Sequence, residues 1–457
     1  MRPAHPAGGA ARTETSRDHS LLVDGPVRRA ILTLAARARA DWGFATTILA
    51  TGFREARLGQ NERRLVAEAV YGQIRLHRRI DHVLGFGLRP TGRTLDDLPA
   101  GERDLARHLA YLVLAVGFGP EEVAAAAPGR VAPALRALAR EEQALASVGD
   151  PERRAAIELS YPDWLVTRLA AEMGLDEARL LCAAMNQRAP LTIRTNTVRT
   201  TRADLARRLA DEGVETEPTT LAADGLRFAR YVNAFGLAAF REGLFEVQDE
   251  GSQLVAEACA PPPRGLVVDA CAGAGGKTLA LAALAGGRGR VVALDVDGRK
   301  LEELRRRARR AGLSNVQARP PGPEATLGLA GRADRVLCDA PCSGLGVLRR
   351  NPEARWRVTP DSVAELPARQ RAILEQYAGL CAPGGRLVYA TCTVLRSEND
   401  GVVEAFLEAH PDFERVLLKE ILGAARALQI GDGTCLRLVP HRHGTDGFFA
   451  AVLRRRG

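Results

Sequence analysis

The chain has 457 residues, of which 46% are hydrophobic and 26% are charged, with 45 Gly and 25 Pro. This composition is typical of a globular protein with two or three domains, and it excludes disordered, collagen-like and coiled-coil proteins. The formal net charge is +9, which is compatible with a polyanionic partner. The longest nearly apolar run is about half the length that spans a bilayer, and the N-terminus lacks the apolar stretch of a signal peptide. We therefore expect a cytoplasmic protein without a membrane segment.

The N-terminal third divides into a tail and a helical domain. Residues 1–20 are polar and rich in Pro, Gly and Ala, which predicts a disordered tail. Apolar residues then recur three and four positions apart, which predicts an all-helical domain over residues 21–150. One face of these helices is expected to be basic and carries Arg63, Arg64, Arg75, Arg78 and Arg79. Such a face either binds RNA or is only solvated, and charge alone does not decide between them.

The next region mixes helices and strands. Residues 147–154 are predicted to be a linker, and a helix is expected to begin near Pro162. The sequence LTIRTNTV predicts a strand, and ADLARRLADEG predicts a helix. We interpret residues 151–241 as a small α+β subdomain that binds RNA or links the larger domains.

Residues 242–457 change character, because short β-branched runs alternate with amphipathic helices. The predicted strands cover residues 265–270, 289–295, 333–340, 385–391 and 448–453. These runs are apolar on both faces, as in strands that are covered on both sides. The pattern predicts an α/β Rossmann-like domain with a mostly parallel, doubly wound sheet.

A glycine-rich turn, DACAGAGGKT (269–278), joins the first of these strands to a helix. Such a turn lets backbone N–H groups approach a ligand closely. A nucleotide-binding P-loop would need glycine at position 271, which is Cys271. Asp295 ends the next strand, where a carboxylate can bind the two hydroxyls of a ribose. These features favour a cofactor that contains a ribose, and at this point NAD also fits.

Two of the eight cysteines stand out, because Cys342 and Cys392 each follow the end of a predicted strand. The carboxyl ends of parallel strands lie at the same edge of a sheet, so we expect the two thiols there together. The chain contains no C-x-x-C pair, and a zinc site is not expected. Most of the other thiols should be buried core residues.

The chain resembles the S-adenosylmethionine-dependent RNA cytosine carbon-5 methyltransferases, in particular the bacterial RsmB (Sun/Fmu) branch. The motifs that carry the resemblance are DACAGAGGKT, ALDVD, DAPCSGLGVLRRNPEARW, LVYATCTVLRSEN and DGFFAA, with FREGLFEVQDEGSQL and RTN upstream. Residues 27–150 resemble the NusB-like helical RNA-binding domain of that branch. The resemblance implies methylation of carbon 5 of a cytosine in small-subunit (16S) ribosomal RNA. It also implies RNA as a partner, no metal, and a monomer.

The resemblance implies roles for individual residues. Cys392 is the nucleophile that attacks carbon 6 of the base, and Cys342 assists release of the product. Asp339 contacts the polar edge of the cytosine, and Lys277 is expected to reach Asp339 or the base. Spacing alone does not assign the two thiol roles. The residues expected to bind the cofactor are Cys271, Ala272, Gly273, Ala274, Gly275, Gly276, Lys277, Asp295 and Asp339.

The sequence departs from the family pattern at two places. Gly273 and Ala274 replace an alanine and a proline of the family's loop, and we expect the cofactor still to bind. The third strand of the sheet normally ends with an aspartate at the adenine, whereas Pro320 and Pro321 stand here and Glu324 is a possible substitute. Two alternatives to the RNA enzyme are a non-catalytic RNA-binding ribosome assembly or antitermination factor, and a cytosine methyltransferase acting on DNA or transfer RNA.

Overall fold

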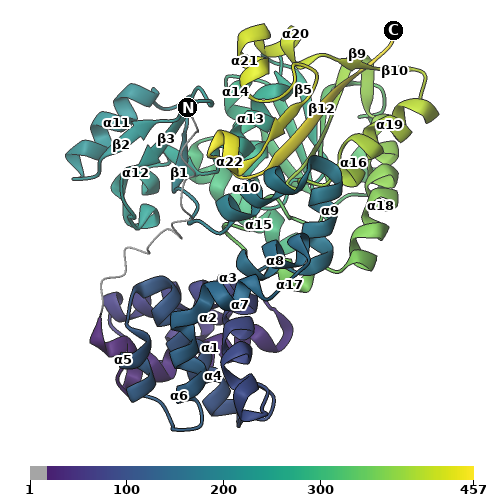
Figure 1. The fold of residues 1–457 in the computed structure, drawn as a ribbon. Coiled ribbons are helices and arrows are strands. Elements are labelled where there is room, and N and C mark those ends of the chain that lie inside the picture. Colours follow the sequence, from purple (N-terminus) through teal and green to yellow (C-terminus); the bar gives the residue numbers. More distant parts are fainter. Residues whose placement is uncertain (1–17) are drawn as a thin grey trace, which may run out of the picture. The chain divides into compact units, whose positions relative to one another are not determined.

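The computed structural model describes residues 18–457 (Figure 1). The chain forms two compact units, one from residues up to 187 together with 348–359, the other from 188–347 together with 360–457. Residues 1–17 of the predicted tail lie outside the described residues. Asp18 accepts a hydrogen bond from the Ser20 N–H and caps the short helix η1 (His19–Leu21), so residues 18–20 of the predicted tail belong to this helix and its cap. Within residues 18–457, no helix has the length and apolar character needed to cross a membrane.

The first unit is helical, as predicted. Its helices are α1 (Pro26–Asp41), α2 (Ala45–Glu55), α3 (Gln60–Leu88), α4 (Ala100–Tyr111), α5 (Pro120–Ala125), α6 (Ala132–Arg136), α7 (Glu141–Ala146), α8 (Pro151–Glu158), α9 (Asp163–Met173), α10 (Leu175–Met185) and α17 (Ala354–Arg357). Helix α3 is central, because α1, α4 and α6 all pack against it. It buries a stripe of apolar residues three and four positions apart, including Val66, Val70, Ile74 and Val83.

Helix α17 lies far along the chain but packs inside the first unit. Arg355 is fully buried there, donates to Asn186 Oδ1 over 2.6 Å, and lies over the ring of Tyr161. Trp356 Nε1 donates to the carbonyl oxygen of Ile74 over 3.0 Å. The second half of the motif DAPCSGLGVLRRNPEARW is therefore structural in the helical unit.

The predicted basic face is wrong for three of its five arginines, because later parts of the same unit cover it. Arg78 donates to the carbonyl oxygen of Tyr161 and to Asp163 Oδ1 over 2.6 and 2.7 Å. Arg79 donates to Glu141, and Arg75 donates to the carbonyl oxygen of Arg349. The charge pattern of one helix does not indicate which face the following chain will cover. Arg63 and Arg64 are exposed.

Residues 147–154, predicted to be a linker, contain a turn and the start of α8. Asp150 caps this helix by accepting from the Arg153 N–H. The compact helical unit continues to Gln187, beyond the predicted domain end at residue 150.

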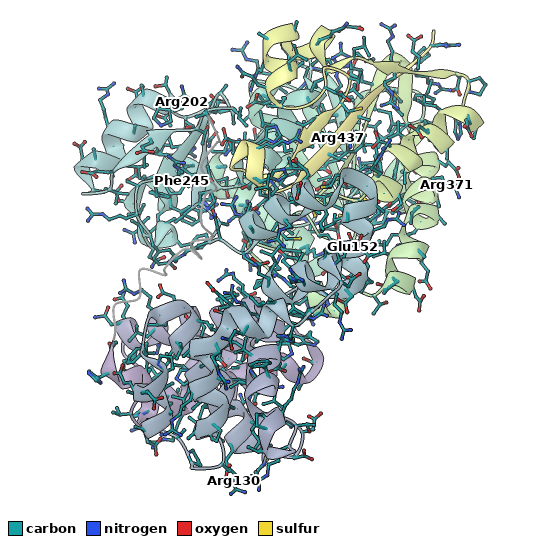
Figure 2. All side chains as sticks on the ribbon, viewed as in Figure 1. Arg130, Glu152, Arg202, Phe245, Arg371 and Arg437 are labelled. Atoms are coloured by element: carbon teal, nitrogen blue, oxygen red, sulfur yellow. The ribbon has the colours of Figure 1, made fainter. Side chains whose placement is uncertain are left out.

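The second unit begins with a small antiparallel sheet in the order β2-β3-β1-β4. Its elements are β1 (Thr192–Thr195), α11 (Arg202–Asp211), β2 (Thr216–Pro218), β3 (Gly225–Phe228), α12 (Ala238–Arg241) and β4 (Phe245–Val247). Phe245, labelled in Figure 2, is fully buried against Ile193, Leu205 and Leu226. The predicted strand and helix correspond to β1 and α11.

A larger sheet follows in the order β10-β12-β9-β8-β5-β6-β7, with β11 beside β12. Its strands are β5 (Leu266–Asp269), β6 (Arg290–Leu294), β7 (Val316–Arg319), β8 (Ala333–Asp339), β9 (Cys381–Thr391), β10 (Phe413–Val416), β11 (Leu436–Leu438) and β12 (Phe448–Arg455). Strands β5 to β9 are parallel, which confirms the predicted mostly parallel sheet. The predicted strand 448–453 belongs to β12, which pairs antiparallel with β9 and β10, so the sheet is mostly and not wholly parallel.

Both faces of this sheet are covered, which confirms the doubly wound arrangement (Figure 1). One core contains residues of α13 (Glu250–Cys259), α14 (Gly276–Leu284), α15 (Gly298–Ala311), α20 (Leu418–Leu422) and α21 (Ala424–Gln429); the other contains residues of α16 (Pro323–Thr326), α18 (Pro360–Ala378) and α19 (Asp400–Ala409). A short helix, α22 (Pro440–His443), precedes β12. Neighbouring strand residues such as Val267 and Val268 enter opposite cores. The carboxyl ends of β5, β6, β8 and β9 therefore meet at one edge.

Candidate active site

The two thiols singled out in the sequence meet at this edge. Strands β8 and β9 are parallel, with Asp339 opposite Ala390, so the residues that follow both strands are neighbours. The Sγ atoms of Cys342 and Cys392 lie 3.4 Å apart. Both side chains are half-buried, whereas five other cysteines, Cys182, Cys259, Cys338, Cys381 and Cys435, are buried. The prediction that these two thiols lie together is confirmed.

The surroundings of Cys342 favour the protonated form of its thiol. The hydrogen bond with Cys392 raises the pKa of the Cys342 thiol well above its usual range, and burial acts in the same direction. The negative charge of Glu398 disfavours a Cys342 thiolate further. Cys342 therefore stays protonated at neutral pH and can donate its S–H to the Cys392 sulfur.

One buried carboxylate connects the loops that carry the two thiols. Glu398 ends the short helix η6 (Arg396–Glu398) and is fully buried. Its Oε1 accepts from Ser343 Oγ over 2.6 Å and from Thr393 Oγ1 over 3.0 Å. Its Oε2 accepts from the Ser343 N–H over 2.9 Å and from Gln370 Nε2 over 3.0 Å. Glu398 thus fixes the residue that follows each thiol.

Sequence reasoning gave Glu398 no role, although it stands in the quoted motif LVYATCTVLRSEN. The sequence offered one indication of a role for Glu398, namely that an acidic residue stands in a motif that continues past the end of a strand. A carboxylate at such a position is more often solvated than buried.

The motif DGFFAA contributes backbone to the same place. The Gly346 N–H donates to the carbonyl oxygen of Cys392 over 2.9 Å, and the Gly447 N–H donates to the carbonyl oxygen of Gly346 over 2.8 Å. A Cβ atom at Gly346 would lie 2.3 Å from the Gly447 oxygen and 2.7 Å from the Cys392 oxygen. Only glycine permits this close approach of three backbone segments.

Lys277 reaches Asp339, as expected from the sequence. Its Nζ donates to Asp339 Oδ2 over 2.6 Å and lies 5.2 Å from the centre of the Phe448 ring. Burial lowers the pKa of Lys277, but the neighbouring acidic groups, with Asp339 as the largest contributor, together outweigh burial, so the net pKa is raised. The lysine is therefore charged and holds Asp339 beside the strand end that precedes Cys342.

The glycine-rich loop bends sharply before α14. Gly275 has φ of 89°, and a Cβ atom there would lie 2.5 Å from Leu304 Cγ. Both oxygens of Asp295 accept backbone N–H groups, Oδ2 from Gly273 over 2.8 Å and Oδ1 from Asp297 over 2.9 Å. The carboxylate at the end of β6 is thereby oriented beside the loop that follows β5.

The loop position that lacks proline is held by a network that sequence reasoning missed. Arg307 of α15 donates to the carbonyl oxygen of Ala274 over 2.7 Å and pairs with Glu246 over 3.0 Å. Arg310 also pairs with Glu246, whose side chain is 4% exposed on β4. Side chains of other elements thus restrain the backbone at Ala274, whereas a proline at that position would restrain its own φ angle.

Asp269 lies fully buried at the end of β5. It accepts a hydrogen bond from Thr278 Oγ1 over 2.7 Å. Burial raises the pKa of this carboxyl to about 7; the Thr278 hydrogen bond lowers it and the negative charge of Asp339 raises it further. Asp269 therefore changes its charge near neutral pH.

No aspartate stands at the end of the third strand of the parallel sheet, β7, and the residues described next are exposed to solvent. Strand β7 ends before Pro320, and Glu324 is an exposed residue of α16. Val296, directly after Asp295, is 86% exposed and presents an apolar side chain at the strand edge.

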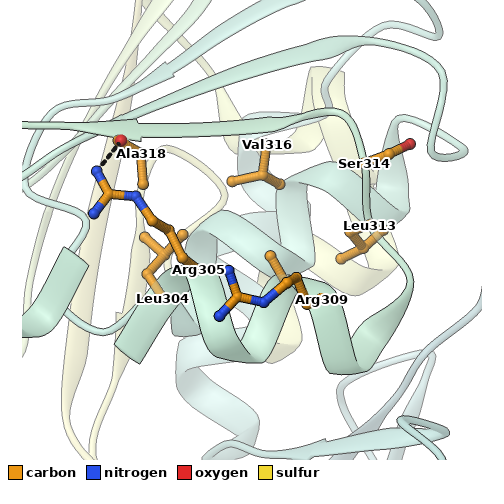
Figure 3. A pocket seen from close by; sticks show the side chains of 8 residues that line it. Leu304, Arg305, Arg309, Leu313, Ser314, Val316 and Ala318 are labelled. Carbon is orange, nitrogen blue, oxygen red and sulfur yellow. Dashed lines mark hydrogen bonds between the residues drawn. The ribbon is translucent and has the colours of Figure 1, made fainter. Parts of the chain in front are cut away.

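A hollow of about 240 Å³ lies between α15 and β7, lined among others by Leu304, Arg305, Leu313 and Val316 (Figure 3). None of the predicted site residues lines this hollow, so it is separate from the thiols.

Comparison with known proteins agrees with the geometry. The family model described as 16S rRNA methyltransferase RsmB/F matches residues 256–454, and a ferredoxin-like domain model of RsmF/B-like methyltransferases matches residues 161–234. A probable ribosomal RNA small subunit methyltransferase B of Bacillus subtilis is 38% identical over 331 residues, covering 71% of this chain and 73% of that protein. A protein of the same description from Synechocystis is 34% identical over 415 residues, covering 87% of this chain and 92% of that protein.

A solved structure shares the same fold over most of the chain. The crystal structure of PH0851 has a TM-score of 0.74 and 27% identity, and the match covers 95% of this chain and 100% of that one. The two family models begin at residue 161, so the NusB-like character of residues 27–150 stays a prediction. The identities and coverage of the relatives show that this chain belongs to the RsmB/F family of methyltransferases.

Proposed function

We propose that this protein methylates carbon 5 of a cytosine in small-subunit ribosomal RNA, with S-adenosylmethionine as the methyl donor. The observation that carries the proposal is the 3.4 Å approach of Cys342 and Cys392 at the edge of the sheet where the glycine-rich loop also lies. Ribosomal RNA is the proposed substrate because the relatives are named as small-subunit ribosomal RNA methyltransferases.

The reaction needs a thiolate because carbon 5 of cytosine is a poor nucleophile. The Cys392 thiolate adds to carbon 6, and the electron pair of the 5,6 double bond becomes available at carbon 5. Carbon 5 then carries both the new methyl group and its original proton. A base takes this proton, the double bond re-forms, and the Cys392 thiolate leaves carbon 6.

The proton on Cys342 supports the assignment of the two roles. A group whose pKa is raised well above its usual range is a poor source of thiolate, so Cys342 is disfavoured as the attacking group. Its S–H lies within hydrogen-bonding distance of the Cys392 sulfur and stabilises that sulfur when it leaves carbon 6. Cys392 is therefore the proposed nucleophile and Cys342 the residue that assists release.

Asp339 and Lys277 are proposed to hold the base. The Asp339 carboxylate can accept a hydrogen bond from the exocyclic amine and favours protonation of ring nitrogen 3, which makes carbon 6 more electrophilic. Lys277 keeps this carboxylate ionised and oriented through the 2.6 Å hydrogen bond.

The residues at the strand edge fit S-adenosylmethionine. Each oxygen of Asp295 accepts one N–H group and keeps a further lone pair for a ribose hydroxyl. The backbone of residues 271–277 and the Asp339 carboxylate are proposed to hold the rest of the molecule, and the exposed side chain of Val296 offers an apolar contact for adenine. When bound, S-adenosylmethionine supplies the methyl group.

The test is bisulfite sequencing of ribosomal RNA from a deletion strain, complemented either by the intact gene or by the Cys392→Ala variant. We expect one protected cytosine of the small subunit to be lost on deletion and restored only by the intact gene. Protection that persists in the deletion strain would contradict the proposal. Loss of protection in transfer RNA alone would identify a different substrate, and restoration by Cys392→Ala would favour a non-catalytic role.

A further inference from the structure

We propose that the segments flanking the small antiparallel sheet, before β1 and between β3 and β4, carry a binding surface for an unpaired stretch of the RNA substrate. The surface, here called the aromatic–arginine patch, consists of Arg188, Arg230, Tyr231, Phe235 and Arg241. The inference rests on RNA being the substrate, as proposed above, and names the residues that would hold it away from the thiols.

Two aromatic side chains of this patch are unusually open. Tyr231 and Phe235 are each 64% exposed, four positions apart in the segment between β3 and α12. Their neighbours Phe228 and Phe245 are buried in the core of the same sheet. Burying an aromatic ring is favourable, so two exposed rings within five residues of one segment indicate a surface that meets a partner.

The rings are held in place by the protein. The guanidinium of Arg188 lies over the Tyr231 ring, 4.6 Å from its centre. The Phe235 ring meets Phe240 edge to face, with centres 5.1 Å apart and planes at 81°. The N–H groups of Ala238 and Ala239 donate to Glu212, which ties this segment to α11. Because the rings are positioned in advance, little conformational entropy is lost when a base stacks on them.

The charge of the patch complements phosphate. Residues 229–241 contain Arg230 and Arg241, both exposed, and no acidic residue. Glu242, which follows directly, pairs with Arg208 over 3.0 Å. Exposed rings beside arginines are the combination by which proteins bind single-stranded RNA, since bases stack on the rings and phosphates pair with the cations. A duplex keeps its bases stacked internally and would not use the rings.

The experiment measures binding of the full-length protein, without cofactor, to a labelled single-stranded RNA of about 10 nucleotides and to a duplex of the same length. We expect Tyr231→Ala to raise the Kd for the single strand about tenfold, because one base loses its stacking partner. Tyr231→Phe keeps the ring and should bind as the unchanged protein does. Leu428→Ala is the matched control, because Leu428 is 66% exposed on α21, outside the patch.

Salt dependence separates the rings from the cations. Arg230→Ala should lower the slope of log K against log salt by about 0.7 for one lost phosphate contact on a single strand. Tyr231→Ala should leave that slope unchanged. Phe235→Ala should act as Tyr231→Ala does, and its thermal unfolding is compared with that of the intact protein because Phe235 also contacts Phe240.

Three results would overturn the inference: unchanged single-strand affinity in Tyr231→Ala, equal losses for single strand and duplex, or a loss of affinity in Tyr231→Phe as large as in Tyr231→Ala. Unchanged RNA affinity would also be the outcome if the patch docks a protein. Methyl transfer is measured separately on the intact protein. If that protein binds through the patch but transfers no methyl group, the proposed function fails while the patch stands. If the intact protein transfers methyl groups and the Tyr231→Ala variant binds RNA normally, the proposed function stands and the patch fails.

Discussion

The Sγ atoms of Cys342 and Cys392 lie 3.4 Å apart, although 50 positions separate the two residues in the chain. Each thiol follows the end of its own strand, and the parallel pairing of β8 and β9 brings the strand ends together. The buried carboxylate of Glu398 then fixes Ser343 and Thr393, the residues that follow the thiols. The short separation is therefore produced by the sheet and adjusted by one side chain.

Glu398→Gln should slow methylation without weakening RNA binding. The amide offers one acceptor oxygen in place of two, and its NH₂ group would face donors that now point at the carboxylate. Misplacing the thiols in this way should lower kcat about tenfold to a hundredfold while the KM for RNA stays the same. The exposed residue Glu404, on α19, gives the matched control Glu404→Gln. A rise in KM with unchanged kcat would show that Glu398 does not position the thiols.

Asp269→Asn should remove a pH dependence of stability. The folded state raises the pKa of this carboxyl from 3.8 to about 7, so it favours the protonated form. The resulting stabilisation is complete below pH 4 and is lost as the pH rises through 7. Relative to the unchanged protein, the variant should gain free energy of unfolding from pH 4 to 7, by about 4 kcal/mol at most. Urea unfolding of both proteins at pH 5 and pH 8 measures the part of this gain that falls above pH 5, about 3 kcal/mol at most. An equal difference at the two pH values would contradict it.

Asp295→Ala should weaken the binding of S-adenosylmethionine at least tenfold. Each charge-assisted hydrogen bond to a ribose hydroxyl contributes about 1.5–3 kcal/mol, and the variant loses this acceptor. Asp297→Ala, two residues away, removes a carboxylate that caps α15 instead and serves as the control. Calorimetry measures both affinities. Unchanged affinity in a folded Asp295→Ala protein would remove Asp295 from the cofactor site.

Cys342 should react more slowly with iodoacetamide than Cys392 at pH 7.5. The thiolate is the reactive form, and the raised pKa of Cys342 keeps its thiolate population small. Peptide mass spectrometry after short exposure gives the modification of each cysteine, and the buried thiols of Cys338 and Cys435 are internal controls. Faster modification of Cys342 would contradict the claim that its thiol stays protonated at neutral pH.

The sequence was sufficient to predict which side chains meet at the site. Runs of β-branched residues mark the strands in the sequence, and parallel pairing places the carboxyl ends of the strands together. The sequence therefore predicted that the residues after these ends lie close to one another. These residues are Cys342, Cys392, Asp339 and Lys277. The strands of the small sheet were harder to predict, because β2 and β4 have three residues each, too few for a periodic pattern.

Residues that act through long-range contacts were missed. Arg307 holds Ala274 and Glu246, which lie 33 and 61 positions away in the chain. Arg78 was assigned to an open basic face but donates to Tyr161, 83 positions on. Arginine is common in this chain, and nothing local distinguishes an arginine that the later chain covers from one that stays in water.

The central claim is that Cys392 attacks the base and Cys342 releases it. A denaturing gel tests this most directly, after each variant is incubated with substrate RNA and S-adenosylmethionine. Cys342→Ala should accumulate a denaturant-stable protein–RNA complex and stop near one turnover, because attack proceeds and release fails. Cys392→Ala should form no complex and transfer no methyl group. A complex trapped by Cys392→Ala and none by Cys342→Ala would reverse the roles and contradict the account.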